Sequence, residues 1–154
     1  MISNEELAEF LREANKNTYA NVGANKASSL RPNSEDYHYE KGDLTYHDTY
    51  FGARDFIGEE IVYKAGKPVW GMNYYGTVLN PTITTADAYK ILRPALMKDS
   101  GDLLPVRGPQ SYTEGTSTYT NRVDGTLEAF SGEENILISG QLVYRGLFHG
   151  GFIK

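Results

Sequence analysis

The chain has 154 residues, which is enough for one domain with a substantial core, and its formal net charge is −5. This charge disfavours nucleic acid as a direct partner, because phosphate binding needs a basic face. The absence of cysteine excludes disulfides, a thiol nucleophile and cysteine-ligated metal. No apolar run reaches membrane-spanning length, and the acidic start lacks the regions of a signal peptide, so we expect a cytoplasmic protein without a membrane partner.

A helix is predicted near the start of the chain, from about Asn4 to Lys16. Ser3 and Glu6 form a capping-box pattern that satisfies backbone N–H groups at a helix start. Apolar residues follow at helical spacing, namely Leu7, Phe10, Leu11 and Ala14. The polar segment 17–34 contains Gly23 and Pro32 and is predicted to be a long loop, either a functional cover or a mobile segment.

Four strands are expected next, because residues alternate in character between turn signals. Their predicted ranges are 36–40, 44–51, 56–64 and 67–75. Within the second of these strands, Tyr46, Asp48 and Tyr50 share one face. A tight turn at Ala65-Gly66 joins the third and fourth strands.

The same plan then begins again. Thr84 and Asp87 offer a second capping box, and a helical stripe follows at Ala88, Ile91, Leu92, Ala95 and Leu96. Pro94 is expected to kink or restart this helix, because it lacks an N–H and crowds the preceding turn. Arg107 precedes the next four strands, as Arg31 precedes the first four, and the last strand ends at Phe148.

The two halves can be aligned with each other, with one residue inserted in the second. Residues 39–76 align with 112–150, and both contain Phe-x-Gly-Glu-Glu, then Gly, then Val followed by an aromatic residue. We interpret this as an internal duplication within a single domain, residues 1–154, with repeat one at about 3–79 and repeat two at about 84–154. The predicted class is α+β: a helix plus a four-stranded antiparallel unit, present twice with pseudo-twofold symmetry, giving about eight strands and two main helices.

Counting outward from the two-residue turns predicts which residues face one another. Ile61 is then opposite Trp70 and Glu59 opposite Met72, while in the second half Asn135 is opposite Tyr144 and Glu133 opposite Gly146. The face expected to pack on the helices carries Glu59, Ile61, Tyr63, Trp70, Met72 and Tyr74. The other face carries Glu60 and Glu134 and is mixed in character. A cross-strand ion pair is expected between Glu134 and Arg145.

Glu59 and Glu133 are the sharpest candidates for chemistry. A pseudo-twofold axis can bring two carboxylates together, where they share a proton, hold a divalent cation or act as acid and base. The structural alternative is favoured: each glutamate caps a turn, or pairs with Arg31 or Arg107. The three histidines have no ligand spacing, so no metal site is predicted, and no nucleophile elbow or phosphate loop indicates catalytic residues or a cofactor.

The tyrosines favour a pocket. The chain has 12 tyrosines and 6 phenylalanines, and a phenol buried in a dry core needs a partner for its hydroxyl. Large aromatic rings with a few polar groups are the usual lining of small-molecule sites. The predicted ligand-binding residues are Tyr46, Glu59, Tyr63, Trp70, Tyr74 and Glu133. The alternative for the rings is ordinary core.

The strings DYHYEKGDLTYHDTYFG, FIGEEIVYKAGKPVWGMNYYG and LFHGG resemble an uncharacterised bacterial and archaeal family known only as a domain of unknown function. In some members the domain follows a helix-turn-helix DNA-binding domain. The resemblance extends from about Phe10 to the C-terminus and implies no catalytic residue or cofactor. The fusion implies a sensor or effector-binding role.

Three hypotheses follow. The first is a non-enzymatic, small-molecule-binding or regulatory module in which Tyr46, Trp70 and Tyr74 hold the ligand and Glu59 anchors it. The second is an enzyme that uses Glu59 and Glu133, with or without a divalent metal. The third is an interaction module, for example a homodimer, that pairs through strand edges or the mixed face.

Overall fold

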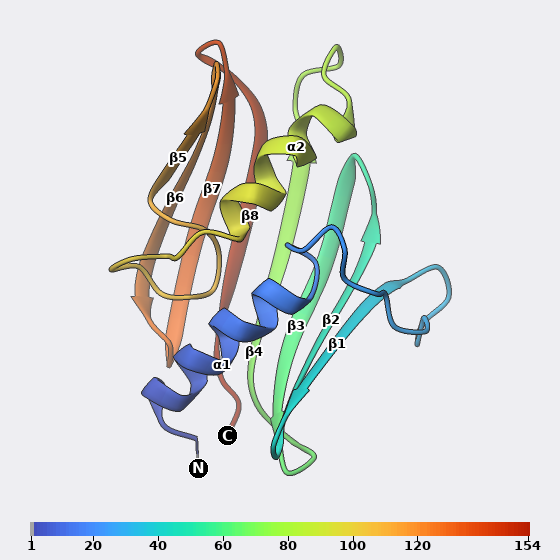
Figure 1. Ribbon diagram of the computed structural model, residues 1–154, viewed down its shortest axis with the longest axis vertical. Helices are drawn as coiled ribbons and strands as arrows, with labels where there is room; N and C mark the ends of the chain where they lie inside the picture. The colour runs from blue at the N-terminus through green and yellow to red at the C-terminus, as the bar shows by residue number, and fades with distance from the viewer. Residues whose placement is uncertain (1) are drawn as a thin grey trace.

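The computed structural model describes residues 2–154 and consists of one antiparallel sheet with two helices lying across one of its faces (Figure 1). The helices are α1 (Asn4–Asn17) and α2 (Thr85–Leu96). The strands are β1 (Glu35–Lys41), β2 (Leu44–Gly52), β3 (Asp55–Lys64), β4 (Lys67–Val78), β5 (Ser111–Glu114), β6 (Ser117–Thr126), β7 (Ala129–Ile138) and β8 (Gln141–Phe152). The predicted α+β class is therefore confirmed.

A single sheet runs through both halves of the chain. Its strand order is β1-β2-β3-β4-β8-β7-β6-β5, so each half contributes a four-stranded meander and the two meanders meet where β4 pairs with β8. Pairs join Trp70 to Phe152 at one end of this seam and Val78 to Tyr144 at the other. The two halves thus share one sheet, while their origin by duplication stays a prediction.

Both helices begin at the predicted caps. The Ser3 hydroxyl accepts a hydrogen bond from the Glu6 backbone N–H at 3.1 Å, while the Glu6 carboxylate receives Lys64 Nζ at 2.6 Å. Thr84 and Asp87 form a complete capping box. Helix α2 continues through Pro94 and ends at Leu96, so the proline lies in the last turn and no new helix starts there.

The predicted pairing register is wrong by one residue, and the cause is a β-bulge in each half. The two-residue turn at Ala65 and Gly66 is confirmed, with φ of 49° and 75°, and Lys64 pairs with Lys67 across it. The register then shifts, so that Val62, instead of Ile61, lies opposite Trp70. A bulge places one extra residue in one strand, which moves every later pair.

The shift recurs in the second half, where Ile136, instead of Asn135, lies opposite Tyr144. The shift changes which glutamate of each Glu-Glu pair points toward the helices. Glu60 pairs with Met72 and Glu134 with Gly146, whereas Glu59 pairs with Asn73 and Glu133 with Leu147. We call the face covered by the helices the inner face and the opposite one the outer face. Glu60 and Glu134 are on the inner face, contrary to the prediction.

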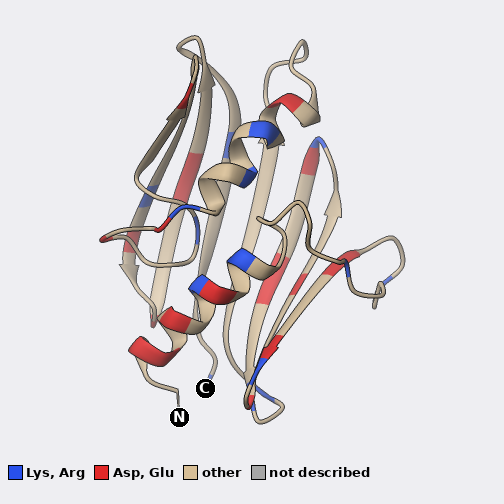
Figure 2. Ribbon diagram, viewed as in Figure 1, with Lys and Arg blue, Asp and Glu red and all other residues tan. Residues whose placement is uncertain are grey.

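Two apolar clusters fill the space between the inner face and the helices. One joins α1 to Trp70, which stacks on Phe130 with ring centroids 5.7 Å apart and donates its indole N–H to Leu127 O at 3.2 Å. The other joins α2 to Tyr144, Ile136 and neighbouring residues. Acidic residues nevertheless lie part-way along β3 and β7, beneath this cover (Figure 2). Neither helix of residues 2–154 combines the length and apolar character that crossing a membrane requires.

Candidate functional site

A cavity of about 210 Å³ lies over the inner face of the first half, between the sheet and the ends of both helices. Aromatic rings make up much of its wall, namely Tyr19, Tyr46, Tyr50, Phe56, Tyr74 and Tyr89. Charged groups also line it, namely Glu35, Asp48, Glu60, Arg93 and Arg107. The combination of apolar walls with a few polar groups is typical of small-molecule sites.

Asp48 and Glu60 sit side by side at this cavity. They are paired residues of β2 and β3, and they are only 3% and 4% exposed. The Tyr74 hydroxyl donates a hydrogen bond to Asp48 Oδ1 at 2.6 Å. Glu60 Oε2 is buried and has no hydrogen-bond partner within residues 2–154. An unpartnered buried carboxylate oxygen is costly in a structural role, so this position needs an explanation.

Burial changes the proton affinity of both carboxyls. Loss of hydration raises the pKa of Asp48 to about 7, although the Tyr74 hydrogen bond acts in the opposite direction. Loss of hydration, together with the charge of Asp48, raises the pKa of Glu60 to about 8. The pair therefore titrates near neutral pH, where small changes in its surroundings alter its charge.

The second half contains a similarly buried glutamate, Glu134, in a very different setting. Arg107 donates to both of its oxygens, from Nε to Oε2 at 3.1 Å and from Nη2 to Oε1 at 2.5 Å. The hydroxyls of Tyr119 and Tyr144 add hydrogen bonds at 2.8 and 2.9 Å. Bidentate pairing with an arginine, completed by two phenols, satisfies this carboxylate fully.

Arg107 lies between the two buried glutamates but serves them unequally. Its Nη1 is 4.0 Å from Glu60 Oε1, at the limit of an ion pair, while Nη2 contacts Glu134 directly. Its guanidinium also lies over the Tyr74 ring, 5.7 Å from the centroid. The predicted pairing of Glu134 with Arg145 is wrong, because the bulge places Gly146 opposite Glu134. Arg145 Nε instead lies 3.4 Å from Glu133.

The structure brings together only part of the predicted ligand-binding set. Tyr46 and Tyr74 line the cavity, and Trp70 lies on the inner face within the core. Tyr63 pairs with Thr45 on the outer face. Glu59 is also on the outer face, where it forms an ion pair with Arg31. This pairing confirms the structural alternative for Glu59.

Glu133 is likewise on the outer face, where the Asn135 side chain donates to it at 2.9 Å. The buried carboxyls Asp48 and Glu60 were not among the predicted site residues. Neither were the cavity-lining residues of α2, namely Tyr89, Arg93 and Leu96. One signal was available, because Asp48 was correctly placed on the same face as Tyr46. The bulge places Glu60, and not Glu59, on the inner face, and no sequence pattern indicated it.

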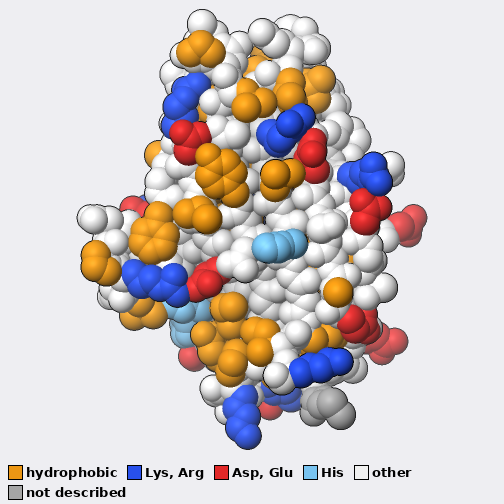
Figure 3. Space-filling view, turned by 180° about the vertical axis from the view of Figure 1, so that it is seen from behind, with side chains coloured by type: hydrophobic (Ala, Val, Ile, Leu, Met, Phe, Trp, Pro, Cys, Tyr) orange, Lys and Arg blue, Asp and Glu red, His pale blue; other side chains and the backbone are white. Residues whose placement is uncertain are grey.

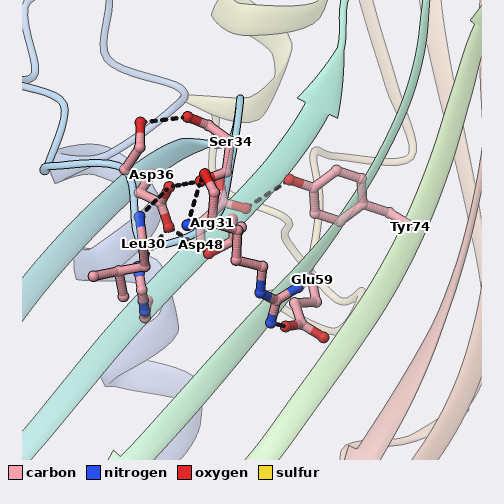
Figure 4. A network of polar contacts seen from close by, with 10 residues as sticks. Leu30, Arg31, Ser34, Asp36, Asp48, Glu59 and Tyr74 are labelled. Carbon is pink, nitrogen blue, oxygen red and sulfur yellow. Dashed lines mark hydrogen bonds and ion pairs between the residues drawn. The ribbon is translucent and has the colours of Figure 1, made fainter.

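A fourth buried acid, Asp36, lies on the outer face, and its carboxylate is fully hydrogen-bonded (Figure 4). It accepts hydrogen bonds from the Ser34 hydroxyl, from Thr49 at 2.6 Å and from the Leu30 N–H at 3.4 Å, and His47 Nε2 lies 3.0 Å away. Burial acts to raise its pKa, but the hydrogen bonds from Ser34 and Thr49 outweigh burial and lower it. Asp36 therefore links the loop before β1 to strand β2 through hydrogen bonds.

Exposed apolar side chains gather on the same outer face (Figure 3). Ile57, Tyr75 and Leu147 are neighbours across β3, β4 and β8, and they are 57%, 45% and 49% exposed. Within residues 2–154, no group of three or more His, Cys, Asp or Glu side chains is arranged to hold a metal ion.

The chain belongs to a family described as Domain of unknown function (DUF5680), whose model matches residues 48–153. The match begins at Asp48 in β2 and includes both glutamate pairs and the α2 side of the cavity. No curated protein and no solved structure matches the chain. Fusion to a helix-turn-helix domain stays a prediction.

Proposed function

We propose that this protein is a small-molecule-binding module whose ligand occupies the cavity under α1 and α2, in keeping with a sensor-like role. The observation that carries the proposal is a cavity of about 210 Å³ walled by aromatic rings, with an unpartnered buried carboxylate oxygen at its edge. An empty cavity of about 150 Å³ in another protein accepts benzene. The volume therefore suits a ligand somewhat larger than a single ring.

The proposed binding residues are Tyr46 and Tyr74, as the sequence predicted, with Asp48 and Glu60 as polar anchors in place of Glu59 and Glu133. Rings and carboxyls come from rigid paired strands, which hold them without an ordering cost on binding. Tyr89 and Arg93 from α2 close the site from above. A small shift of α2 would change access to the cavity, which suits a sensor.

A fragment screen by amide NMR tests this proposal. Ligands of eight to ten heavy atoms, an order-of-magnitude match to the cavity, should shift the amides of β2, β3 and α2 in a saturable way. The variant Ala53→Trp adds a large side chain at a cavity-lining position that is exposed, and it should abolish the shifts. The control Thr116→Trp changes an exposed turn in the other half and should leave them intact. Shifts that persist in Ala53→Trp, or a screen without hits, would reject the proposal.

A second candidate is an acid–base enzyme that uses Asp48 and Glu60 in place of Glu59 and Glu133. It is favoured by two neighbouring carboxyls whose pKa values are raised to about 7 and about 8 beside a cavity. If the pair transfers protons, a bound ligand with an acidic C–H should gain deuterium in D₂O with the wild-type protein and not with Asp48→Asn. NMR of the ligand measures this, and equal exchange with both proteins would remove the candidate.

A further inference from the structure

Three buried carboxyls surround one buried guanidinium beneath the helices. Asp48, Glu60 and Glu134 are 3%, 4% and 1% exposed, and Arg107 is 9% exposed. Arg107 gives its two direct contacts to Glu134, and Asp48 receives the neutral Tyr74 hydroxyl. When Asp48 and Glu60 are ionised, the cluster therefore has three carboxylates for one guanidinium, and Glu60 Oε2 lacks a partner at the cavity.

We propose that the cavity binds a cationic ligand, an aryl amidinium or protonated amine, whose N–H groups bind the carboxylates of Glu60 and Asp48. This inference rests on the proposed function and specifies its ligand class. A buried anion is stable only when it is paired and hydrogen-bonded, and the ligand would supply both a charge and donors. Charge-assisted bonds of this kind are about twice as strong as neutral ones.

The walls of the cavity suit the same class of ligand. Tyr46, Tyr50 and Tyr74 present rings next to the carboxyls, and the face of an aromatic ring attracts a cation. The second cation of the cavity, Arg93, lies over the Tyr19 ring at 4.5 Å from its centroid. Within residues 2–154, Arg93 forms no ion pair with Asp48 or Glu60, so it leaves both anchors to the ligand.

Binding should be linked to proton release. A bound cation favours the ionised forms of Glu60 and Asp48, whose pKa values burial has raised to about 8 and about 7. Affinity should therefore increase as the pH rises from 6 to 8, and protons should be released on binding. The other titratable or charged groups around the pair are Tyr46, Tyr74, Arg107, Glu134 and Asp36, with Glu35, Tyr19, Tyr50, Tyr89 and Arg93 at the cavity wall.

Three probes of nearly equal size test the charge requirement, namely benzamidine, benzamide and benzoate, which are cationic, neutral and anionic. Calorimetry at pH 8 should show benzamidine binding at least about tenfold more tightly than benzamide, with benzoate weakest, because bonds to charged groups contribute about 1.5–3 kcal/mol. Calorimetry of benzamidine in buffers of different ionisation enthalpy should also show the release of protons. Equal binding of benzamide and benzamidine, or preferred binding of benzoate, would overturn the inference.

Adjacent glutamates on opposite faces supply the matched variants. Glu60→Gln should weaken benzamidine about tenfold or more and leave benzamide within about twofold, because only the charge is lost. Glu59→Gln alters the next residue, on the outer face, and should change neither affinity. Asp48→Asn gives a second, independent reduction if Glu60→Gln does not fold. Equal effects of Glu59→Gln and Glu60→Gln would contradict the assignment.

The results separate the two proposals. Benzamide or benzoate binding in the cavity, with no preference for the cation, would overturn the ligand class and leave small-molecule binding in place. Binding of none of the three probes would also overturn the ligand class, and the wider fragment screen would then decide the proposed function on its own.

Discussion

Glu60 and Glu134 occupy corresponding positions in the two halves of the chain, yet their surroundings are opposite. Both lie on the inner face and both are nearly fully buried. Glu134 accepts hydrogen bonds from Arg107, Tyr119 and Tyr144, so both of its carboxylate oxygens have partners. Glu60 faces a cavity, and one of its oxygens has no partner within residues 2–154.

The difference arises in the loops before each set of strands. Arg107 reaches into the inner face and pairs with Glu134, whereas Arg31, from the loop before β1, lies on the outer face and pairs with Glu59 (Figure 4). One half thus provides its buried carboxylate with an internal cation and the other does not. Under the proposed function, the first half binds the ligand and the second half has a structural role.

The largest expected effect is on Glu134. Glu134→Gln should cost about 3–5 kcal/mol in the free energy of unfolding, because it leaves the buried Arg107 charge without its direct partner. Urea denaturation at pH 8 measures this cost. Glu60→Gln, under the same conditions, should be neutral or stabilising, because it removes a carboxyl that burial disfavours in its charged form. Equal losses in both variants would show that the two glutamates play the same structural role.

A pH titration of stability sharpens the comparison. The pKa values of Asp48 and Glu60 are raised in the folded state, so the fold binds more protons than the unfolded chain between about pH 4 and pH 8. Stability should be highest at the acidic end of this window and fall as the pH rises through about 7 and about 8.

Between pH 5 and pH 8 this pair should lower the Tm by roughly 10 °C or more, because each unit of raised pKa corresponds to about 1.4 kcal/mol and each kcal/mol to about 2–4 °C for a chain of this size. Glu60→Gln should flatten the slope, while Glu59→Gln should retain the wild-type slope. A calorimetric scan at each pH gives the Tm. A wild-type slope in Glu60→Gln would show that the burial of this carboxyl does not set the pH dependence.

Tyr74 offers a smaller test, because its counterpart in the second half is Phe148. Tyr74→Phe removes the hydroxyl that donates to Asp48 and should cost about 1–3 kcal/mol near pH 8, where a charged Asp48 would lose its donor. The cost should shrink at pH 5, where Asp48 is protonated. Denaturation curves at both pH values report the difference, and a pH-independent cost would argue for lost packing instead.

The smallest effect is expected on the outer face. Glu59→Gln breaks an ion pair with Arg31, whose side chain is 54% exposed. Exposed pairs contribute about 0–1 kcal/mol, and salt screens them. The loss should vanish at about 1 M NaCl, where screening is nearly complete. A loss above 2 kcal/mol, on the order of a buried pair, would mean that Glu59 carries a role which the register does not indicate.

Local sequence patterns determined the elements of this fold. Capping residues located both helices, turn residues located the hairpins, and alternation placed Tyr46 and Asp48 on one face of β2. These features depend on near neighbours in the chain, so a single sequence is enough to predict them. The family resemblance was also correct, since the chain belongs to a domain family of unknown function.

Only the tertiary structure decided which glutamate of each Glu-Glu pair is buried. One bulge in β4 and another in β8 move the register by one residue, and a period of two then exchanges the faces of every later side chain. Whether Glu60 or Glu134 has a cationic partner depended in turn on contacts between residues far apart in the sequence, such as Arg107 with Glu134. The sequence shows two equal glutamates, and loop paths in three dimensions leave one paired and the other open to a cavity.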